Sequence, residues 1–544
     1  MTRKTANVRV NQVGYRPIDV KHFVTDDAVG KQFEVLNDNG DIVLTGDLSQ
    51  PIRDESSGET VCRGDFSALR APGIYMIRIA GTDATSYPFK VAADVYHEAT
   101  DALLKCFYFQ RCGMELAPGY AGAWAHKACH TAHAAVYGEE GKMLPQRGGW
   151  HDAGDYGKYT VAAAKAIADL LLAYECYPSA FSRPIGIPET GGGIPDILHE
   201  VRYELEFLLN MQRAKDGAVF HKVSTRQFPG LAVMPEDDTA ELVFSPVSVA
   251  ASATFAAAMA RSARVYRFVA APFAEKCLAA AEKAWEWAAA NRETGGFKNP
   301  PGIMTGEYGD QTIADEIYWA SAELFRTTGQ SRYLTAFHSA LKEAMFPLCE
   351  LGWADVAGYG TLAYLGSPQE QTDPEVRGRL LTEWLTRADE FMSNCERNGY
   401  LISLVPEQYI WGSNMVLLNQ AMHLILAARF SGNMSYEEAA LHHLHYLFGR
   451  NPVNLSYVTG IGTAAVQNPH HRPSIADGVR EPVPGMVAGG PDRGLQDDCA
   501  KANLQGLPPA KCFIDHRDSY STNEMAIYWN SPAVFVAACF NDVK

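Results

Sequence analysis

The chain has 544 residues and a mass of 59.5 kDa; 47% of its residues are hydrophobic and 20% are charged. This composition is typical of a globular protein with a sizeable core and excludes disorder, collagen and a coiled coil. With 63 acidic against 47 basic residues the formal charge is −16, so we expect no nucleic-acid partner. No apolar run reaches the roughly 18 residues of a membrane span, so we expect no membrane partner.

The first residues, MTRKTANVRV, carry positive charge but lack the apolar stretch of a secretory leader. The 11 cysteines are odd in number and scattered along the chain, which does not indicate a disulfide framework. Together these observations predict a reduced, cytoplasmic protein, or a secreted one if a leader has been trimmed.

Residues 1–94 contain short segments in which hydrophobic residues alternate with polar ones. Turn signals separate them, and Asn39-Gly40 between two such segments predicts a hairpin. The expected strands are 8–10, 33–35, 42–44 and 75–79. We therefore expect a small all-β sandwich over residues 1–94.

Residues 95–544 change to long Ala- and Leu-rich segments of helical period. The expected helices are 156–174, 197–212, 247–265, 273–291, 315–328, 377–394, 411–428 and 436–448. They predict a mainly α domain of paired helices. Two loop regions, 143–155 and 459–518, are unusually long, and long loops in a compact domain often carry function.

The first candidate site is the run from Gly148 to Tyr159, which places Asp152 and Asp155 just before a helical segment. A helix N-terminus favours ionised carboxylates and would suit a general base. The alternative is that Asp155 simply caps the helix.

The second run contains Glu524, three residues after Ser521, which is the spacing of a capping box that opens a helix. A catalytic acid at this position needs a raised pKa, so burial or a second carboxylate would have to outweigh the helix start. The third run holds His470 and Arg472 in a long loop. Both side chains can donate hydrogen bonds to sugar hydroxyls, but a solvated surface pair is an alternative.

Together these runs resemble glycoside hydrolase family 9, a group of inverting β-1,4-glucanases, and the resemblance covers nearly the whole chain. The acid motif of the family is met at Phe513, Asp515, Tyr520, Glu524, Ala526, Asn530 and Ser531. The histidine motif is met at Ser456, Val458, Thr459, Gly462, Pro469, His470 and Arg472, and departs at Ala464. The segments 10–15 and 65–67 resemble the immunoglobulin-like module of one branch.

The resemblance implies an (α/α)6-barrel catalytic domain over residues 95–544, after an immunoglobulin-like sandwich over 1–94. It implies that Asp155 is the general base, that Asp152 holds the attacking water and that Glu524 is the acid. Inversion needs two carboxyl groups far enough apart to admit a water. His470 and Arg472 would then hold sugar hydroxyls. Trp411 and Tyr520 are candidate stacking surfaces, with core packing as the alternative.

A structural zinc site is also implied by the resemblance. Its ligands would be Cys112, Cys129, His130 and His151, a pattern that matches no short zinc motif and that buried cysteines would also explain. Calcium would suit a dense set of oxygen ligands, with a solvated acidic turn as the alternative. The candidate calcium ligands are Thr305, Gly306, Asp310, Asp315, Glu316 and, by resemblance, Asp355. No organic cofactor is expected.

The expected reaction is inverting hydrolysis of β-1,4-linked oligosaccharides. A cytoplasmic enzyme would meet short soluble substrates, which favours an exo-β-D-glucosaminidase or the trimming of cello-oligosaccharides over an endo-β-1,4-glucanase. A catalytically idle carbohydrate-binding protein is the alternative from another class. The presence of Asp152, Asp155 and Glu524 together argues against it, because a binder needs neither an acid nor a base.

Overall fold

The computed structural model describes residues 8–26, 32–310 and 312–541. The chain divides into two compact units. One consists of Met1–Cys106, Ala388–His470 and Arg480–Lys544, and the other of Phe107–Arg387 and His471–Val479. In the described part of the chain, no helix combines the length and the apolar character that crossing a membrane requires.

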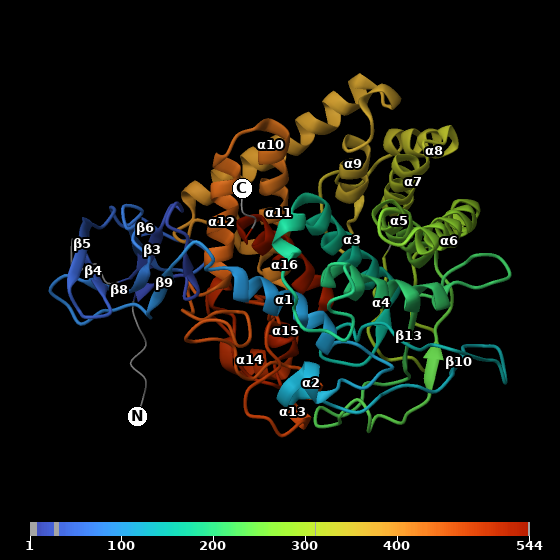
Figure 1. Ribbon diagram of the computed structural model, residues 1–544, viewed down its shortest axis with the longest axis horizontal. Coiled ribbons are helices and arrows are strands. Elements are labelled where there is room, and N and C mark those ends of the chain that lie inside the picture. Colours follow the sequence, from blue (N-terminus) through green and yellow to red (C-terminus); the bar gives the residue numbers. More distant parts are fainter. Residues whose placement is uncertain (1–7, 27–31, 311, 542–544) are drawn as a thin grey trace. The chain divides into compact units, whose positions relative to one another are not determined.

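The N-terminal strands, blue in Figure 1, form two sheets that share one hydrophobic core. One sheet has the order β1-β3-β7-β6, with bounds Val8–Arg9, His22–Thr25, Thr60–Asp65 and Ile52–Arg53. The other has the order β2-β9-β8-β4-β5, with bounds Gly14–Tyr15, Phe89–Val91, Gly73–Ile79, Gln32–Asn37 and Ile42–Asp47. The predicted hairpin is confirmed: β4 pairs antiparallel with β5, and Gly40 in the turn has φ +85°.

The first unit also contains helices from both the beginning and the end of the helical part of the chain. They are α1 (His97–Phe109, up to residue 106), α11 (Ser413–Ser431), α12 (Ser435–Leu447), α14 (Asp498–Leu504), α15 (Tyr520–Asn523) and α16 (Ile527–Asn541). Helix α10 (Pro374–Arg397) runs from the second unit into this one. Helices α11, α12 and α16 pack against one another. Helix α11 ends at Ser431, and the next residue, Gly432, has a positive φ of 75° that terminates the helix.

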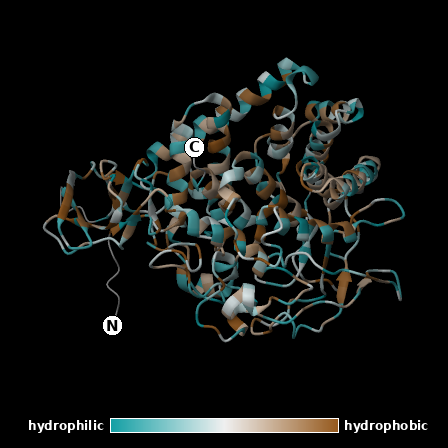
Figure 2. Cartoon of the chain, in the orientation of Figure 1, coloured by the Kyte–Doolittle hydropathy of each residue, from teal (hydrophilic) through white to brown (hydrophobic). Residues whose placement is uncertain are grey.

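The second unit is a series of packed helices. They are α2 (Pro118–Ala121), α3 (Thr160–Cys176), α4 (Asp196–Met211), α5 (Val249–Tyr266), α6 (Ala271–Ala290), α7 (Ala314–Thr328), α8 (Ser331–Lys342), α9 (Ala357–Leu365) and α13 (Arg472–Ala476). Helix α5 packs against α3, α6 and α7, and α7 packs against α8 and α9. In Figure 2 helices α6 and α8 carry both hydrophilic and hydrophobic stretches, as expected for helices that bury one face.

A small sheet in the second unit was not predicted from the sequence. Its order is β11-β10-β14-β13-β12, with bounds Met143–Leu144, Ala134–Val136, Leu242–Phe244, Lys222–Thr225 and Lys158–Tyr159. Its strands are only two to four residues long, which is too short for a period-2 pattern to stand out. This sheet matters for function because β12 directly follows the Asp152–Asp155 run.

The sandwich contacts helix α12 through buried polar side chains of the first unit. The hydroxyl of Tyr96 donates to the carbonyl oxygen of Gly14 at 3.2 Å, and Nε2 of His445 lies 3.1 Å from the same hydroxyl. The ring of Tyr15 packs edge-on against His445 with 4.8 Å between the ring centroids. These contacts join the first strands to the helical part of the same unit.

Two further histidines, His22 and His442, lie at this contact between the sandwich and helix α12, and both are uncharged. Arg450 donates from Nη1 to Nδ1 of His442 at 3.2 Å, an arrangement that a protonated His442 could not accept. The His22 ring lies 5.5 Å from that of His442. Burial lowers the pKa of His22 to about 4, and burial together with the Arg450 charge lowers the pKa values of His442 and His445 well below their usual range.

We expect acid to destabilise this region. Below about pH 6.5 the unfolded chain binds protons at these histidines and the folded chain does not, so the free energy of unfolding falls as the pH drops from about 6.5 toward 4. Each such histidine removes about 1.4 kcal/mol per pH unit in that window. The midpoint temperature should therefore fall more steeply between pH 7 and pH 5 in the parent than in His442→Gln. His516→Asn, at a side chain 49% exposed, should keep the parental slope. Equal slopes for the parent and His442→Gln would contradict this origin.

Candidate active site

Asp152 and Asp155 lie in a loop whose entry is shaped by two glycines. Gly148 and Gly149 have φ values of +85° and +81°, and a Cβ on Gly149 would lie 2.6 Å from the ring of Phe207. Only glycine fits this path without strain. The chain then runs through the two aspartates into β12 and helix α3.

Asp155 does not cap helix α3, so that interpretation is wrong. The helix begins at Thr160, its N-cap position is Tyr159, and that residue makes no side-chain capping bond. Strand β12 separates the aspartates from the helix start, so the helix terminus is not their immediate setting. Instead Oδ2 of Asp155 accepts hydrogen bonds from the Gly157 N–H at 2.8 Å and from the Tyr159 hydroxyl at 3.4 Å. Burial raises the pKa of Asp155, and the charge of Arg472 acts against that rise.

Asp152 is fully buried on the same loop. Its N–H donates to the Gly157 carbonyl at 2.9 Å, and the hydroxyl of Tyr308 donates to its Oδ2 at 2.5 Å. Its Oδ1 is buried and has no hydrogen-bond partner among the described residues. Burial holds the pKa of Asp152 well above its usual range. One oxygen of this carboxyl group is therefore fixed, and the other is available to a water or a substrate.

Arg472 supports this loop and is not a solvated surface residue. Its N–H and its Nη1 donate to the Gly154 carbonyl at 3.1 and 2.8 Å, and its Nε donates to the Pro229 carbonyl at 3.0 Å. The residue is only 5% exposed. The surface-pair alternative is wrong for this arginine, which binds the backbone between the two aspartates.

Gln110 is a further support that sequence reasoning missed. Its Nε2 donates to the carbonyls of His151 and Ala153 at 3.1 and 2.9 Å, and its Oε1 lies 3.0 Å from Nε2 of His471. Both amide protons are used on carbonyls, so Oε1 is the acceptor and His471 carries its proton on Nε2. Nδ1 of His471 then accepts from the Ser474 N–H. The only signal in the sequence is the position of Gln110, two residues before Cys112.

Glu524 does not form the predicted capping box. Helix α15 ends at Asn523, Glu524 is its extended C-cap residue, and α16 begins only at Ile527. The backbone of Glu524 pairs with His470 in a parallel bridge, and its carbonyl accepts from the Gly489 N–H at 2.7 Å. Glu524 is half-buried, and its place in the chain is between α15 and α16, not in the first turn of a helix.

Aromatic rings gather near Glu524 in the first unit. The Trp411 and Tyr520 ring centroids are 5.2 Å apart, and those of His470 and Tyr520 are 6.0 Å apart. Trp411 is 41% exposed, so core packing does not explain it. Nδ1 of His470 lies 2.6 Å from the Arg517 carbonyl, which fixes this ring.

Asp497 holds the short helix α15 and was also missed. Its Oδ2 accepts from the Ser521 N–H and hydroxyl at 2.9 and 2.7 Å and from the Ser519 hydroxyl at 3.1 Å. Nothing in the local sequence indicates this contact, because the partners lie more than 20 residues away.

The four predicted zinc ligands come together in the second unit, all of them buried. Nδ1 of His130 lies 3.8 Å from Sγ of Cys112 and 3.4 Å from Nε2 of His151, which is 3.9 Å from Sγ of Cys129. Zinc bonds of about 2.3 Å to sulfur and about 2.0–2.1 Å to nitrogen place tetrahedral partners about 3.3–3.8 Å apart. The donor set and its spacing therefore fit a zinc ion.

Three of the predicted calcium ligands also gather. The carboxylates of Asp310, Asp315 and Glu316 lie within 4.8 Å of one another, without Asp355. Burial raises the pKa of Asp315 to about 7 and that of Glu316 well above its usual range, which excludes a solvated turn.

The other predicted calcium ligands have different partners. Thr305 and Gly306 accept hydrogen bonds from the Lys222 ammonium group, so their oxygens face a cation that the chain itself supplies. The backbone next to Asp355 does reach the cluster, because the Val356 N–H donates to Asp315 at 2.9 Å.

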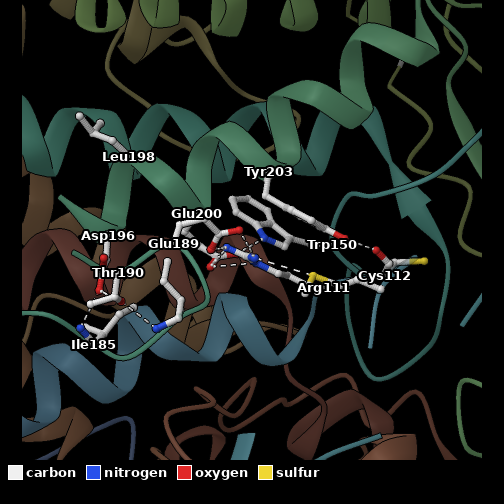
Figure 3. Close-up of polar contacts among 12 residues, drawn as sticks. Arg111, Cys112, Trp150, Ile185, Glu189, Thr190, Asp196, Leu198, Glu200 and Tyr203 are labelled. Carbon is white, nitrogen blue, oxygen red and sulfur yellow. Dashed lines mark hydrogen bonds and ion pairs between the residues drawn. The ribbon is translucent and has the colours of Figure 1, made fainter. Parts of the chain in front are cut away.

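Arg111 forms an ion cluster with Glu189 and Glu200 beside Trp150, as Figure 3 shows. Arg111 bonds to Glu200 at 2.9 Å and to Glu189 at 3.0 Å, and its guanidinium lies 4.4 Å from the centroid of the Tyr203 ring. Nε1 of Trp150 donates to Glu200 at 2.9 Å. Arg111 precedes Cys112, and Trp150 precedes His151 and Asp152. The cluster therefore links helix α4 to the candidate metal site and to the aspartate loop.

Comparisons with known proteins show the family to which the chain belongs. The model of the family described as Glycosyl hydrolase family 9 matches residues 96–537, and that of the Cellulase N-terminal ig-like domain matches residues 3–84. A cellodextrinase from Butyrivibrio fibrisolvens is 38% identical over 97% of this chain and 98% of its own length.

Solved structures are similar over nearly the whole chain. A crystal structure of a thermostable endoglucanase mutant from Alicyclobacillus acidocaldarius is 43% identical, with a TM-score of 0.94 over 99% of this chain and 100% of its own. A zinc-binding triple mutant of a family 9 endoglucanase is 33% identical, with a TM-score of 0.91 over 97% of this chain and 100% of its own. The chain belongs to glycosyl hydrolase family 9, and it is a glycoside hydrolase whose (α/α)6 barrel follows an immunoglobulin-like β-sandwich.

Proposed function

We propose that the chain hydrolyses β-1,4-linked glucans with inversion, acting as an endo-β-1,4-glucanase that also accepts cello-oligosaccharides. The observation that carries this proposal is the pair of buried aspartates on one loop fixed at its backbone by Gln110 and Arg472. Similar proteins named cellodextrinase and endoglucanase support a glucan substrate. They do not support the exo-β-D-glucosaminidase expected from the sequence, so the endo-glucanase alternative is the better one.

In this proposal Asp155 is the base that deprotonates the attacking water. Its Oδ2 accepts from a backbone N–H, and the nearby Arg472 charge favours its ionised form. Asp152 holds the same water through Oδ1, because Oδ2 already accepts from Tyr308. Glu524 protonates the leaving oxygen. Inversion then requires room for a water between base and acid, with carboxyl groups about 6.5–9.5 Å apart.

The substrate would be held by His470, Arg472, Tyr520 and Trp411. The partly exposed Trp411 ring offers a face to a pyranose ring, which stacks on aromatic side chains. Arg472 uses Nε and Nη1 on backbone carbonyls, so Nη2 is the donor that would reach a sugar hydroxyl. These side chains offer an apolar surface and hydrogen-bond donors, both of which a sugar requires.

Zinc at Cys112, Cys129, His130 and His151 would be structural, since four protein ligands close its coordination. It would fix His151 next to Asp152. Calcium at Asp310, Asp315 and Glu316 would neutralise three clustered carboxylates and order the segment that carries Tyr308. We also propose the domain division at residue 94, between β9, the last strand of the sandwich, and the first helix, α1.

Product analysis tests the substrate and the mode of action. We expect cellopentaose to yield a spread of shorter products early in the reaction, and the glucosamine pentamer and chitopentaose to remain intact. Chromatography of products over time gives the sizes, and NMR of the first products should show the α-anomer. Early release of monomer alone would contradict endo action. Cleavage of the glucosamine pentamer would contradict the glucan assignment, and a β-anomer would contradict inversion.

A further inference from the structure

Asp238 lies directly behind one of the candidate zinc ligands. Its Oδ2 is 3.3 Å from Nε2 of His130, while Nδ1 of the same ring faces Cys112 and His151. The two ring nitrogens therefore point to different partners, one to the candidate metal position and the other to a carboxylate. A histidine nitrogen binds a metal only through its lone pair, so the ring proton must sit on Nε2 and needs an acceptor there.

The Asp238 side chain is well placed for this purpose. It is 5% exposed, and the side chain of His130 is 2% exposed, so their hydrogen bond is shielded from water. Oδ1 of Asp238 accepts from the Ala240 N–H at 3.4 Å, and its backbone N–H donates to the Met234 carbonyl at 3.2 Å. The carboxylate is therefore held by its own turn, independently of His130.

The segment that carries Asp238 is itself fixed to the surroundings of the site. The Val233 carbonyl accepts from the Tyr156 hydroxyl at 2.6 Å, and Glu236 accepts from the Lys127 N–H at 3.4 Å. The ring of Tyr156 packs 5.5 Å from that of His130. His130 has an unusual backbone with φ +46°, so its ring direction depends on such contacts and not on a regular element.

We propose that Asp238 is the positioning residue of the zinc site. It accepts the Nε2–H of His130, fixes the tautomer that leaves Nδ1 for the metal, and thereby slows the release of zinc. This inference rests on the proposed zinc site. It adds a residue 108 positions away from its partner that the spacing of cysteines and histidines does not reveal.

Zinc release tests the inference on the intact enzyme. Parent, Asp238→Asn and Asp238→Ala are loaded with zinc, and transfer to an excess of the coloured chelator pyridylazoresorcinol is followed over time. Loss of a carboxylate behind a histidine ligand typically costs about 10–100-fold in metal affinity. We expect zinc transfer from Asp238→Ala to be faster by about that factor. Asparagine keeps a neutral acceptor, so Asp238→Asn should fall between Asp238→Ala and the parent.

Glu236→Gln is the matched control, because glutamine keeps an oxygen that accepts from the Lys127 N–H, and the ion contact of Glu236 is with His126, which is not one of the four candidate ligands. It should release zinc at the parental rate. Cobalt-substituted parent and Asp238→Ala should show the same thiolate charge-transfer band, as expected if Asp238 is not itself a ligand.

The outcomes separate the inference from the proposals on which it rests. A parent that holds zinc, with Asp238→Ala releasing it no faster than the parent, overturns the role of Asp238 alone. A parent that binds no zinc overturns both the zinc site and this inference. The proposal of glucan hydrolysis is tested separately, by analysing the products formed from cellopentaose. If Asp238→Ala does not fold, the comparison of Asp238→Asn with Glu236→Gln decides.

Discussion

Glu524→Gln is expected to lose nearly all hydrolysis of cello-oligosaccharides and to keep much of its activity on dinitrophenyl β-cellobioside. A sugar leaving group needs a proton as the glycosidic bond breaks, whereas dinitrophenolate is stable without one. A positioned general acid contributes about 10²–10⁴-fold, so kcat on cellopentaose should fall by that factor. Glutamine keeps the size of the side chain and removes only the transferable proton.

Asp155→Asn separates the base from the acid, because it should lose activity on both substrates. The attacking water must be deprotonated whatever the leaving group is, so the variant should hydrolyse dinitrophenyl β-cellobioside as poorly as cellopentaose. The matched control is Asp518→Asn, an exposed aspartate six residues before Glu524 whose side chain is 54% exposed. It should keep the parental kcat. If Glu524→Gln lost activity on both substrates equally, or Asp155→Asn kept its activity on the aryl substrate, the acid and base roles would be misassigned.

The sequence is most informative where hydrophobic periodicity is sustained. The β4–β5 hairpin and helices α3, α5 and α7 were predicted, because each carries a continuous pattern or a turn signal that depends only on near neighbours. The small sheet β10–β14 was not, because its strands are too short to show a pattern. Its order depends on pairings between segments about 100 residues apart, such as β10 with β14.

The candidate site shows the same division between local and distant contacts. From the neighbouring residues alone, Asp155 and Glu524 fit the pattern of helix caps, and both interpretations are wrong. Strand β12 lies between Asp155 and helix α3, and helix α15 ends before Glu524. The residue runs nevertheless singled out Asp152, Asp155 and Glu524 as candidates, and the resemblance to a family added their proposed roles and the candidate zinc ligands. Gln110, Tyr308, Asp238 and Asp497 were missed, since each acts on a partner distant in the sequence.

Arg111→Met is expected to be among the most destabilising single substitutions in the second unit. The Arg111 side chain is fully buried, and so is that of Glu200, whereas Glu189 is 36% exposed. Methionine fills similar space but leaves the Glu200 carboxylate in a low-dielectric interior without its cation. Removing one partner of a buried ion pair costs about 3–5 kcal/mol. The carboxylate keeps its bond from Trp150, so Trp150 and the aspartate loop behind it should shift as well.

The two partners of Arg111 differ in exposure, so the effects of replacing each of them can be ranked. Urea unfolding should place the free energy of unfolding in the order parent, Glu189→Gln, Glu200→Gln and Arg111→Met, from most to least stable, because water already screens Glu189.

Arg202→Met is the matched control: Arg202 pairs with Glu206 on the exposed face of α4, with both side chains at least 40% exposed. Surface pairs contribute about 0–1 kcal/mol, so this control should stay near the parent. If the free energy of unfolding fell no more in Arg111→Met than in Arg202→Met, the Arg111 ion cluster would not be what holds the aspartate loop. A large loss should instead lower both the midpoint of unfolding and the rate on cellopentaose, since Trp150 is two residues from Asp152.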